Sequence, residues 1–299
     1  MVGRTGIKES PTDRVFLTLV TAFLIGVMIL ILYPLIFIVS SSFSSTAAVT
    51  SGRVWLFPVE PSLAGYKAIF KNNQVLSGYA NSLFYTTVGT TVNVVMTIMA
   101  AYPLSRKDLY GRRVLMFLFT FTMLFSGGLI PLYIVVSRLG MIDKRIALIA
   151  PTAMAVFQMI IARTFFQMNI PQELAEAAEM DGCSDLHFLL KVVLPLSGPI
   201  IAVIALMYAV NHWNAFFHAL IFLKTNGLFP LQMVLRNILI QNSFDPTMIK
   251  DPTTMMEMQG LRDLLKYALI VVASLPVLSI YPFVQRHFVK GVLIGSVKG

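Results

Sequence analysis

Acidic side chains recur every three residues in one short polar segment that lies between two long apolar runs. They are Glu173, Glu176 and Glu179. Pro171 suits the first turn of a helix, and residues three apart share one side of it. Asp181 and Gly182 end this predicted helix, because glycine accepts the left-handed conformation of a C-terminal cap. Ala177 and Ala178 leave the helix thin, so the chemistry that this segment offers is close binding of a partner.

A second short helix is expected after the glycine turn. Ser184 can cap its start, most of the residues up to 193 are apolar, and Pro195 stops the helix or turns it into the next apolar run. Residues 167–197 therefore read as an acidic helix, a sharp turn and an apolar helix on a membrane surface. Such an element can pass the movement of a docked soluble partner to the two spans that adjoin it. The helical pattern alone leaves an ordinary amphipathic connecting loop as an equal alternative.

Catalytic and metal-binding chemistry has little support in the sequence. The one cysteine, Cys183, excludes an intrachain disulfide and is interpreted as a small buried filler. The four histidines are scattered without metal-ligand spacing. Ser126, which precedes two glycines, has no obvious histidine partner, and such a lone serine is usually structural. We therefore expect no catalytic residue, no metal and no cofactor.

The composition is that of an integral membrane protein. Of the 299 residues, 57% are hydrophobic and 12% are charged, and the mean hydropathy is +0.76. Soluble domains carry about 25% charged residues because charge must cover their wet surface. The net charge of +9 comes from basic residues that lie mostly in short segments between apolar runs, which disfavours nucleic acid as a partner.

Six apolar runs are long enough to cross the ~30 Å hydrocarbon core of a bilayer as helices. They are residues 15–43, 82–104, 114–137, 146–166, 198–223 and 264–283. We expect an all-α integral membrane protein of about six transmembrane helices, with the first run retained because no cleavage site follows it. The basic cluster at 106–113 favours the cytoplasm for its loop, whereas Arg138, Lys144 and Arg145 oppose the same orientation, so charge leaves the sidedness open.

Polar side chains within these runs are costly in lipid and usually face the interior of a helix bundle. The candidates for a solute path are Asn93, Gln158, Asn211, His212, Asn214 and His218, accompanied by the aromatic residues Trp213, Phe216 and Phe217. Amides and aromatic rings are suited to sugars. Hydrogen bonding between helices is an equal alternative for the same residues.

The segment 167–197 resembles the EAA signature of ABC importer permeases. The matching residues are Glu176-Ala177-Ala178, Asp181-Gly182, Val192-Val193-Leu194-Pro195 and Pro199. Two mild departures are Val192 in place of Ile, and Cys183 where Ala is common. In that family this segment, here named the coupling element, docks in a groove of the cytoplasmic ATPase. The resemblance implies that Glu176 pairs with a basic group there, and Glu173 is counted with it among the residues that couple to the ATPase.

The C-terminal residues resemble the tail of maltose-type, MalG-like permeases for carbohydrate uptake. The matches are Gln285-Arg286, Phe288-Val289, Gly291 and Val297-Lys298-Gly299. The resemblance implies that Lys298 and Gly299 contact the ATPase, while a frayed basic end is the alternative. The stretch Trp213-Asn214-Ala215-Phe216 fits the same group. Residues 229–232 resemble the LplC/YtcP-like permeases for complex or acidic oligosaccharides.

In maltose-type systems the loop between spans five and six faces the solute-binding protein. The matching residues here are 224–263, with Asn242, Asp245 and Pro246 at the expected tip. Connections of this length are usually functional or disordered, so a passive loop is the weaker reading.

The resemblance implies a multi-pass permease subunit in the bacterial inner membrane that imports a carbohydrate, with an oligosaccharide expected. Its partners would be a second, different permease, two ATPase subunits that hold ATP and magnesium, an extracytoplasmic binding protein and lipid. Residues 1–14 and 289–299 would be cytoplasmic, and 15–288 would form the permease domain. The alternatives are a permease for amino acids, peptides or metal chelates, an intramembrane enzyme, and a membrane adaptor.

Overall fold

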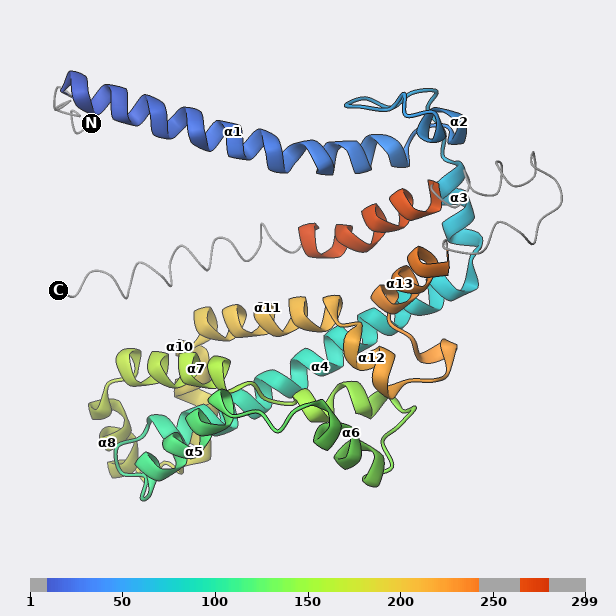
Figure 1. Cartoon of the computed structure of the whole chain (residues 1–299). Coiled ribbons are helices and arrows are strands. Elements are labelled where there is room, and N and C mark those ends of the chain that lie inside the picture. Colours follow the sequence, from blue (N-terminus) through green and yellow to red (C-terminus); the bar gives the residue numbers. More distant parts are fainter. Residues whose placement is uncertain (1–9, 242–263, 280–299) are drawn as a thin grey trace. The chain divides into compact units, whose positions relative to one another are not determined.

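The computed structural model describes residues 10–241 and 264–279 (Figure 1). These residues form helices and connecting turns, and none of them lies in a β-strand. The all-α prediction is confirmed for this part of the chain. Two compact units are present, one with the described residues up to Lys71 and 264–272, the other with Asn72–Gln241 and 273–279.

The first unit begins with α1, Pro11–Ser42. Proline at the first helical position costs no hydrogen bond, because that N–H has no partner within a helix. The most apolar stretch of α1 has a mean hydropathy of 2.9 and buries no residue against the rest of the described chain. A helix that is apolar and uncovered over such a length is expected to contact lipid or a partner protein.

Two short helices follow in the same unit, α2 (Thr46–Thr50) and α3 (Ala64–Lys71). Gly65 lets α3 approach the apolar helix that begins at Leu264. A Cβ atom at position 65 would lie 3.0 Å from the Leu264 side chain and 3.2 Å from that of Ala268.

The second unit is organised around α4, Asn73–Ser105. The side chain of Asn72 caps its start by accepting a hydrogen bond from the Gln74 backbone N–H at 2.9 Å. The α4 helix packs against α7 (Val156–Asn169), α11 (Gly198–Asn214) and α13 (Leu231–Gln241). With 33 residues, α4 is long enough to cross a membrane by itself.

The predicted third span is broken in the structure. Helices α5 (Arg112–Leu124) and α6 (Leu129–Arg138) meet at 111°, so residues 114–137 do not form one straight helix. Gly128 has φ +85°, a backbone conformation that side-chain-bearing residues rarely adopt, and it begins α6. The Ser126-Gly127-Gly128 stretch is therefore a hinge between two half-helices.

The predicted fourth and fifth spans are also interrupted. The 3₁₀ turns η1 (Arg145–Leu148) and η2 (Ala150–Thr152) meet α7 at 50°. Pro151, within η2, lacks the N–H that a regular α-helix would use at that position. The run 198–223 is divided at residues 215–216 into α11 and α12 (Phe217–Phe222).

Length and composition allow two spans in the described residues, or five if each bent pair is one span. The final predicted run is helical over Leu264–Ser279, and its last residues lie outside the described ranges. The number six therefore remains a prediction.

Candidate coupling surface and polar cavity

The coupling element has the local structure that its sequence predicts. The acidic helix is α8, Gln172–Met180, and Gly182 follows it with φ +71°. The Ser184 hydroxyl accepts a hydrogen bond from the His187 backbone N–H at 3.4 Å and caps α9 (Asp185–Phe188). A π-helical turn, η3 (Leu189–Val193), and the short α10 (Leu194–Leu196) lead into α11, which is bent by 83° relative to them.

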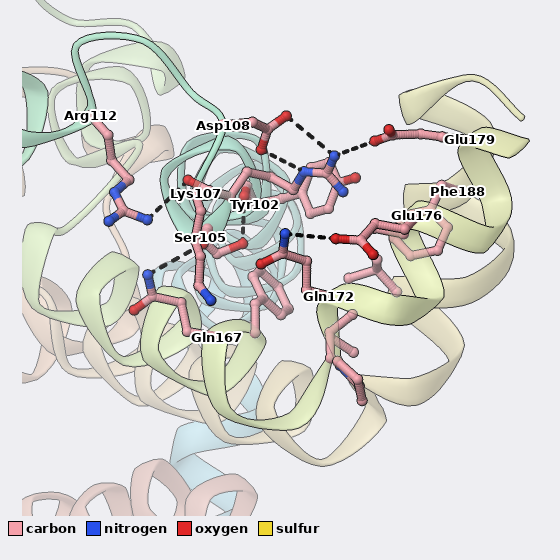
Figure 2. A pocket seen from close by; sticks show the side chains of 16 residues that line it. Tyr102, Ser105, Lys107, Asp108, Arg112, Gln167, Gln172, Glu176, Glu179 and Phe188 are labelled. Atoms are coloured by element: carbon pink, nitrogen blue, oxygen red, sulfur yellow. Dashed lines mark hydrogen bonds and ion pairs between the residues drawn. The ribbon is translucent and has the colours of Figure 1, made fainter.

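The three acidic residues of α8 are all exposed, as their shared side of the helix allows, but they have different partners. Glu179 accepts a hydrogen bond from the guanidinium of Arg106 at 2.6 Å, so it is turned toward the α4–α5 connection (Figure 2). Glu176 accepts one from the Gln172 side chain at 2.9 Å. Glu173 is exposed. Steps of 100° per residue spread three such positions over about a third of the helix circumference, which is enough to separate their partners.

Arg106 is a site residue that the sequence reasoning missed, although it belongs to the basic cluster at 106–113. Its side chain is 20% exposed and bonds both Glu179 and Asp108, the latter at 3.1 and 3.3 Å. Burial opposes the charge on Arg106, but the hydrogen bonds to the two carboxylates outweigh it and raise the pKa of Arg106. The same guanidinium lowers the pKa of Asp108. Arg106 and Asp108 therefore stay ionised at neutral pH.

A cavity of about 420 Å³ lies between α8 and the C-terminal end of α4 (Figure 2). Its polar lining includes Arg106, Lys107, Arg112, Gln167, Glu176 and Glu179. Its apolar lining includes Tyr102, Phe166, Ala175, Phe188 and Val193, which belong to one buried hydrophobic cluster. Through Ala175, which is 6% exposed, α8 is seated on that cluster.

The coupling element exposes several apolar side chains, and Met180 lies one turn after Glu176 on α8. The side chains of Met180, Leu186 and Leu174 are 88%, 65% and 42% exposed. Ala177 is also exposed, whereas Ala178 is half-buried and packs on the hydrophobic cluster. Cys183 packs there too, which agrees with its interpretation as a filler. An apolar patch with a carboxylate beside it is the composition of a protein-docking surface.

A second cavity, of about 350 Å³, lies among α4, α11 and the 3₁₀ turns. Its polar lining is Tyr85, Asn93, Thr152, Tyr208, Asn211, His212 and His218. Asn93 bonds His212 at 2.6 Å through its carbonyl oxygen and donates its amide to the Thr152 carbonyl. The Tyr208 hydroxyl bonds Thr97 at 2.7 Å and accepts from the Ala155 N–H at 3.1 Å.

The cavity contains some of the predicted solute-path residues and excludes others. Gln158 and Phe217 do not line it. The indole N–H of Trp213 donates to the Ala273 carbonyl at 2.9 Å, and Asn214 donates to the Val210 carbonyl of its own helix. These bonds give Trp213 and Asn214 structural roles in the described chain. Tyr85, Thr152 and Tyr208 were missed, since a lone hydroxyl in an apolar run carries little sequence signal.

Asp143 holds two loops together at the other end of the unit. Its carboxylate accepts hydrogen bonds from the Lys224 N–H, the Thr225 N–H and the Thr225 hydroxyl at 2.8, 2.8 and 2.6 Å. The Thr225 hydroxyl bond is the main cause of the lowered pKa of Asp143, followed by the two N–H bonds. The carboxylate is thus fully ionised above the ordinary pKa of about 3.9, and the clamp is lost only as the pH falls through the lowered value.

We expect Asp143→Ala to open these loops at neutral pH. Trypsin should then cleave faster after Lys144, Arg145 and Lys224, all exposed in the structure, because local opening governs cleavage. Asp143→Asn keeps an acceptor oxygen and the tolerance of asparagine for φ +60°, so it should fall between wild type and Asp143→Ala. Equal cleavage rates in all three proteins would show that the carboxylate does not hold the loops.

The expected loop tip (Asn242, Asp245 and Pro246) and the expected tail contacts (Lys298 and Gly299) lie outside the described residues. Their roles remain predictions.

Comparison with known proteins gives consistent results. Residues 93–294 match the model of the family described as "Binding-protein-dependent transport system inner membrane component". The chain is 44% identical over 288 residues to the polygalacturonan/rhamnogalacturonan transport system permease protein YtcP of Bacillus subtilis (strain 168), covering 96% of this chain and 99% of that protein. It is 43% identical over 293 residues to protein LplC of the same organism, covering 98% of each.

A solved structure is also similar. It is the crystal structure of a bacterial ABC transporter involved in the import of the acidic polysaccharide alginate, one chain of which superposes with a TM-score of 0.85 at 35% identity. The match covers 94% of this chain and 99% of that chain. The fold, the family match and both relatives agree, and the chain therefore belongs to the family of inner membrane components of binding-protein-dependent transport systems.

Proposed function

We propose that this chain is one of two different permease subunits of an ABC importer and that two cytoplasmic ATPase subunits drive it. The observation that carries the proposal is the coupling element, in which an exposed apolar surface with Glu176 beside it is seated on the end of α4. Family membership supports the same assignment. Under this proposal ATP and magnesium bind to the ATPase, and the permease holds neither.

The cargo that we propose is an oligosaccharide with acidic residues. One relative is named for polygalacturonan and rhamnogalacturonan, and the solved transporter imports alginate. Both names point to sugar polymers that carry carboxylates, which supports carbohydrate over amino acids, peptides or metal chelates.

The 350 Å³ cavity is the proposed place where this subunit contacts the cargo. Among the described residues no charged side chain lines it, and its amide, imidazole and phenol groups suit sugar hydroxyls. The predicted path residues that line it are Asn93, Asn211, His212 and His218. The carboxylates of the cargo would then be recognised elsewhere, on the partner permease or the binding protein.

The sidedness that we propose places the coupling element and both termini in the cytoplasm, with loop 224–263 facing the binding protein. The Asp143 clamp supports this, because it ties the start of that loop to residues 141–145 at the end of α4 remote from α8. The tail residues Lys298 and Gly299 would reach the ATPase.

Purification with the products of the neighbouring genes tests the proposal. We expect an N-terminally tagged chain to bring down a second permease and an ATPase in mild detergent. In proteoliposomes with the ATPase inside and the binding protein outside, we expect ATP-dependent uptake of labelled oligogalacturonides. Neutral maltooligosaccharides and peptides serve as controls.

Two outcomes would contradict the proposal. Absence of any ATPase from the wild-type preparation would return the membrane adaptor and the intramembrane enzyme to consideration. Uptake of peptides without uptake of sugars would reject the cargo and keep the importer.

A further inference from the structure

Helix α4 joins two distant parts of the second unit through its side chains at both ends. Figure 1 shows α8 beside the C-terminal end of α4 and α13 beside its N-terminal end. The 25 residues between Asn81 and Arg106 correspond to about 37 Å at 1.5 Å per residue. No break divides the helix over this length.

At the N-terminal end, α4 holds the segment that leads into loop 224–263. The Asn81 amide donates to the carbonyls of Gly227 and Phe229 at 2.7 and 3.2 Å. The Tyr85 hydroxyl donates to the Leu228 carbonyl at 2.9 Å, and the Ser82 hydroxyl accepts from the Leu231 N–H at 2.8 Å. Asn81, Ser82 and Tyr85 are all buried, so this segment is bonded firmly to α4.

At the C-terminal end, side chains from α7 and α5 bond the last carbonyls of α4 and that of the capping residue Arg106. Arg163 donates to the Leu104 carbonyl at 2.9 Å and Gln167 to the Ser105 carbonyl at 3.3 Å. Arg112 donates to the Arg106 carbonyl at 3.1 Å. A helix leaves its last carbonyls without partners, and here the partners lock the end of α4 in place.

The coupling element is attached to this same end in two ways. Ala175 packs on the hydrophobic cluster that contains Tyr102 and Leu104 of α4. The Arg106 guanidinium bonds Glu179 at 2.6 Å, from a residue 73 positions earlier in the chain. These contacts attach α8 to the end of α4, which is distant from the coupling element in sequence.

We propose that α4 is the rigid strut that relays movement between the coupling element and the base of loop 224–263, with Arg106 as the positioning residue that fastens α8 to it. This inference rests on the proposed function, which supplies an ATPase on one side and a binding protein on the other. A charge-assisted bond is suited to this role because it is directional, whereas apolar contacts allow the two helices to slide. Docking of the binding protein at loop 224–263 can then change the position of the coupling element on the ATPase through α4.

The test uses the whole transporter in proteoliposomes with its ATPase and binding protein. Arg106→Glu and Glu179→Arg should each leave the amount of co-purified ATPase unchanged, because the docking face of α8 remains. Each should reduce the stimulation of ATP hydrolysis by the binding protein by about fivefold or more, the lower range of coupling between sites. The double variant Arg106→Glu/Glu179→Arg should recover at least half of the stimulation.

Arg113→Glu is the matched control. It makes the same charge change in the same loop, and Arg113 is exposed. It should behave as wild type. If a charge reversal prevents folding, Arg106→Gln and Glu179→Gln remove the ion pair with less disturbance and should lose stimulation in the same direction.

Three results would contradict the proposed role of α4 as a rigid strut. The first is that the Arg106 and Glu179 variants retain the stimulation of the Arg113→Glu control. The second is that the double variant is as impaired as the single ones, since the pair would then not act as a pair. The third is loss of the ATPase itself from the single variants, which would make Arg106 part of the docking surface. A failure of the proposed function would look different: in that case no ATPase would co-purify even with the wild-type permease.

Discussion

Glu176→Lys is expected to reduce the ATPase recovered with the permease by about thirtyfold or more while the permease itself stays in the membrane. Glu176 is exposed and accepts a hydrogen bond from Gln172 of the same helix, so its carboxylate is accessible to a basic group of a partner. Losing one hydrogen-bonded charge pair costs about 2–5 kcal/mol, and each 1.4 kcal/mol is a factor of ten in affinity. Lysine there would also stand beside the cavity that Arg106 and Arg112 line, which adds repulsion.

Co-purification in mild detergent measures this effect, with quantitative blotting of both subunits. Glu173→Lys is the matched control, because it makes the same charge change on α8 at an exposed position that does not line the cavity. It should lose far less ATPase. Glu176→Gln separates the loss of charge from the repulsion. Equal losses for Glu173→Lys and Glu176→Lys would mean that general electrostatics governs docking and that Glu176 has no specific partner.

Gly89→Ala is expected to abolish transport and to lower the thermal stability of the permease. A Cβ atom at position 89 would lie 2.5 Å from the Nε2 atom of His212 and 2.6 Å from Cε1, closer than any such contact allows. Forcing the His212 ring away costs about 1–3 kcal/mol for overpacking. It also separates His212 from Asn93, and each buried polar group left without a partner costs about 1–3 kcal/mol.

Heating the detergent-solubilised permease before size-exclusion chromatography measures the stability, and vesicle uptake measures transport. Gly26→Ala on α1 is the matched control, since nothing lies within 4 Å of its added Cβ. Adding His212→Ala to Gly89→Ala removes the clashing ring and should restore part of the stability but no transport, if the cavity binds cargo. A Gly89→Ala protein as stable and active as Gly26→Ala would show that α4 and α11 do not need this close contact.

The sequence by itself determined the membrane class and the local structure of the coupling element. Composition and long apolar runs are sufficient for the first, because lipid leaves helices as the structure that satisfies each backbone group. Pro171, Gly182 and Ser184 define the second, since helix starts, left-handed turns and caps depend on neighbouring residues. The family resemblance at Glu176–Gly182 also rests on residues that are close together in the sequence.

Apolar runs could not reveal where the spans break. The bend at Gly128 and the division at residues 215–216 leave each run apolar throughout, so hydropathy reads them as single helices. The tertiary structure decides such breaks because neighbouring helices supply the partners that the interrupted backbone needs.

The pairings within the sites were decided by tertiary structure alone. Arg106 and Glu179 are 73 positions apart, and Asn93 and His212 are 119 apart. One sequence shows each of these residues as a polar group without indicating its partner. Spacing placed Glu176 and Glu179 on one side of α8, and the folded chain adds that Ala175 is buried and that Glu179 is bonded to Arg106. The pairing needs tertiary structure because it joins side chains from α8 and from the end of α4, which local sequence does not bring together.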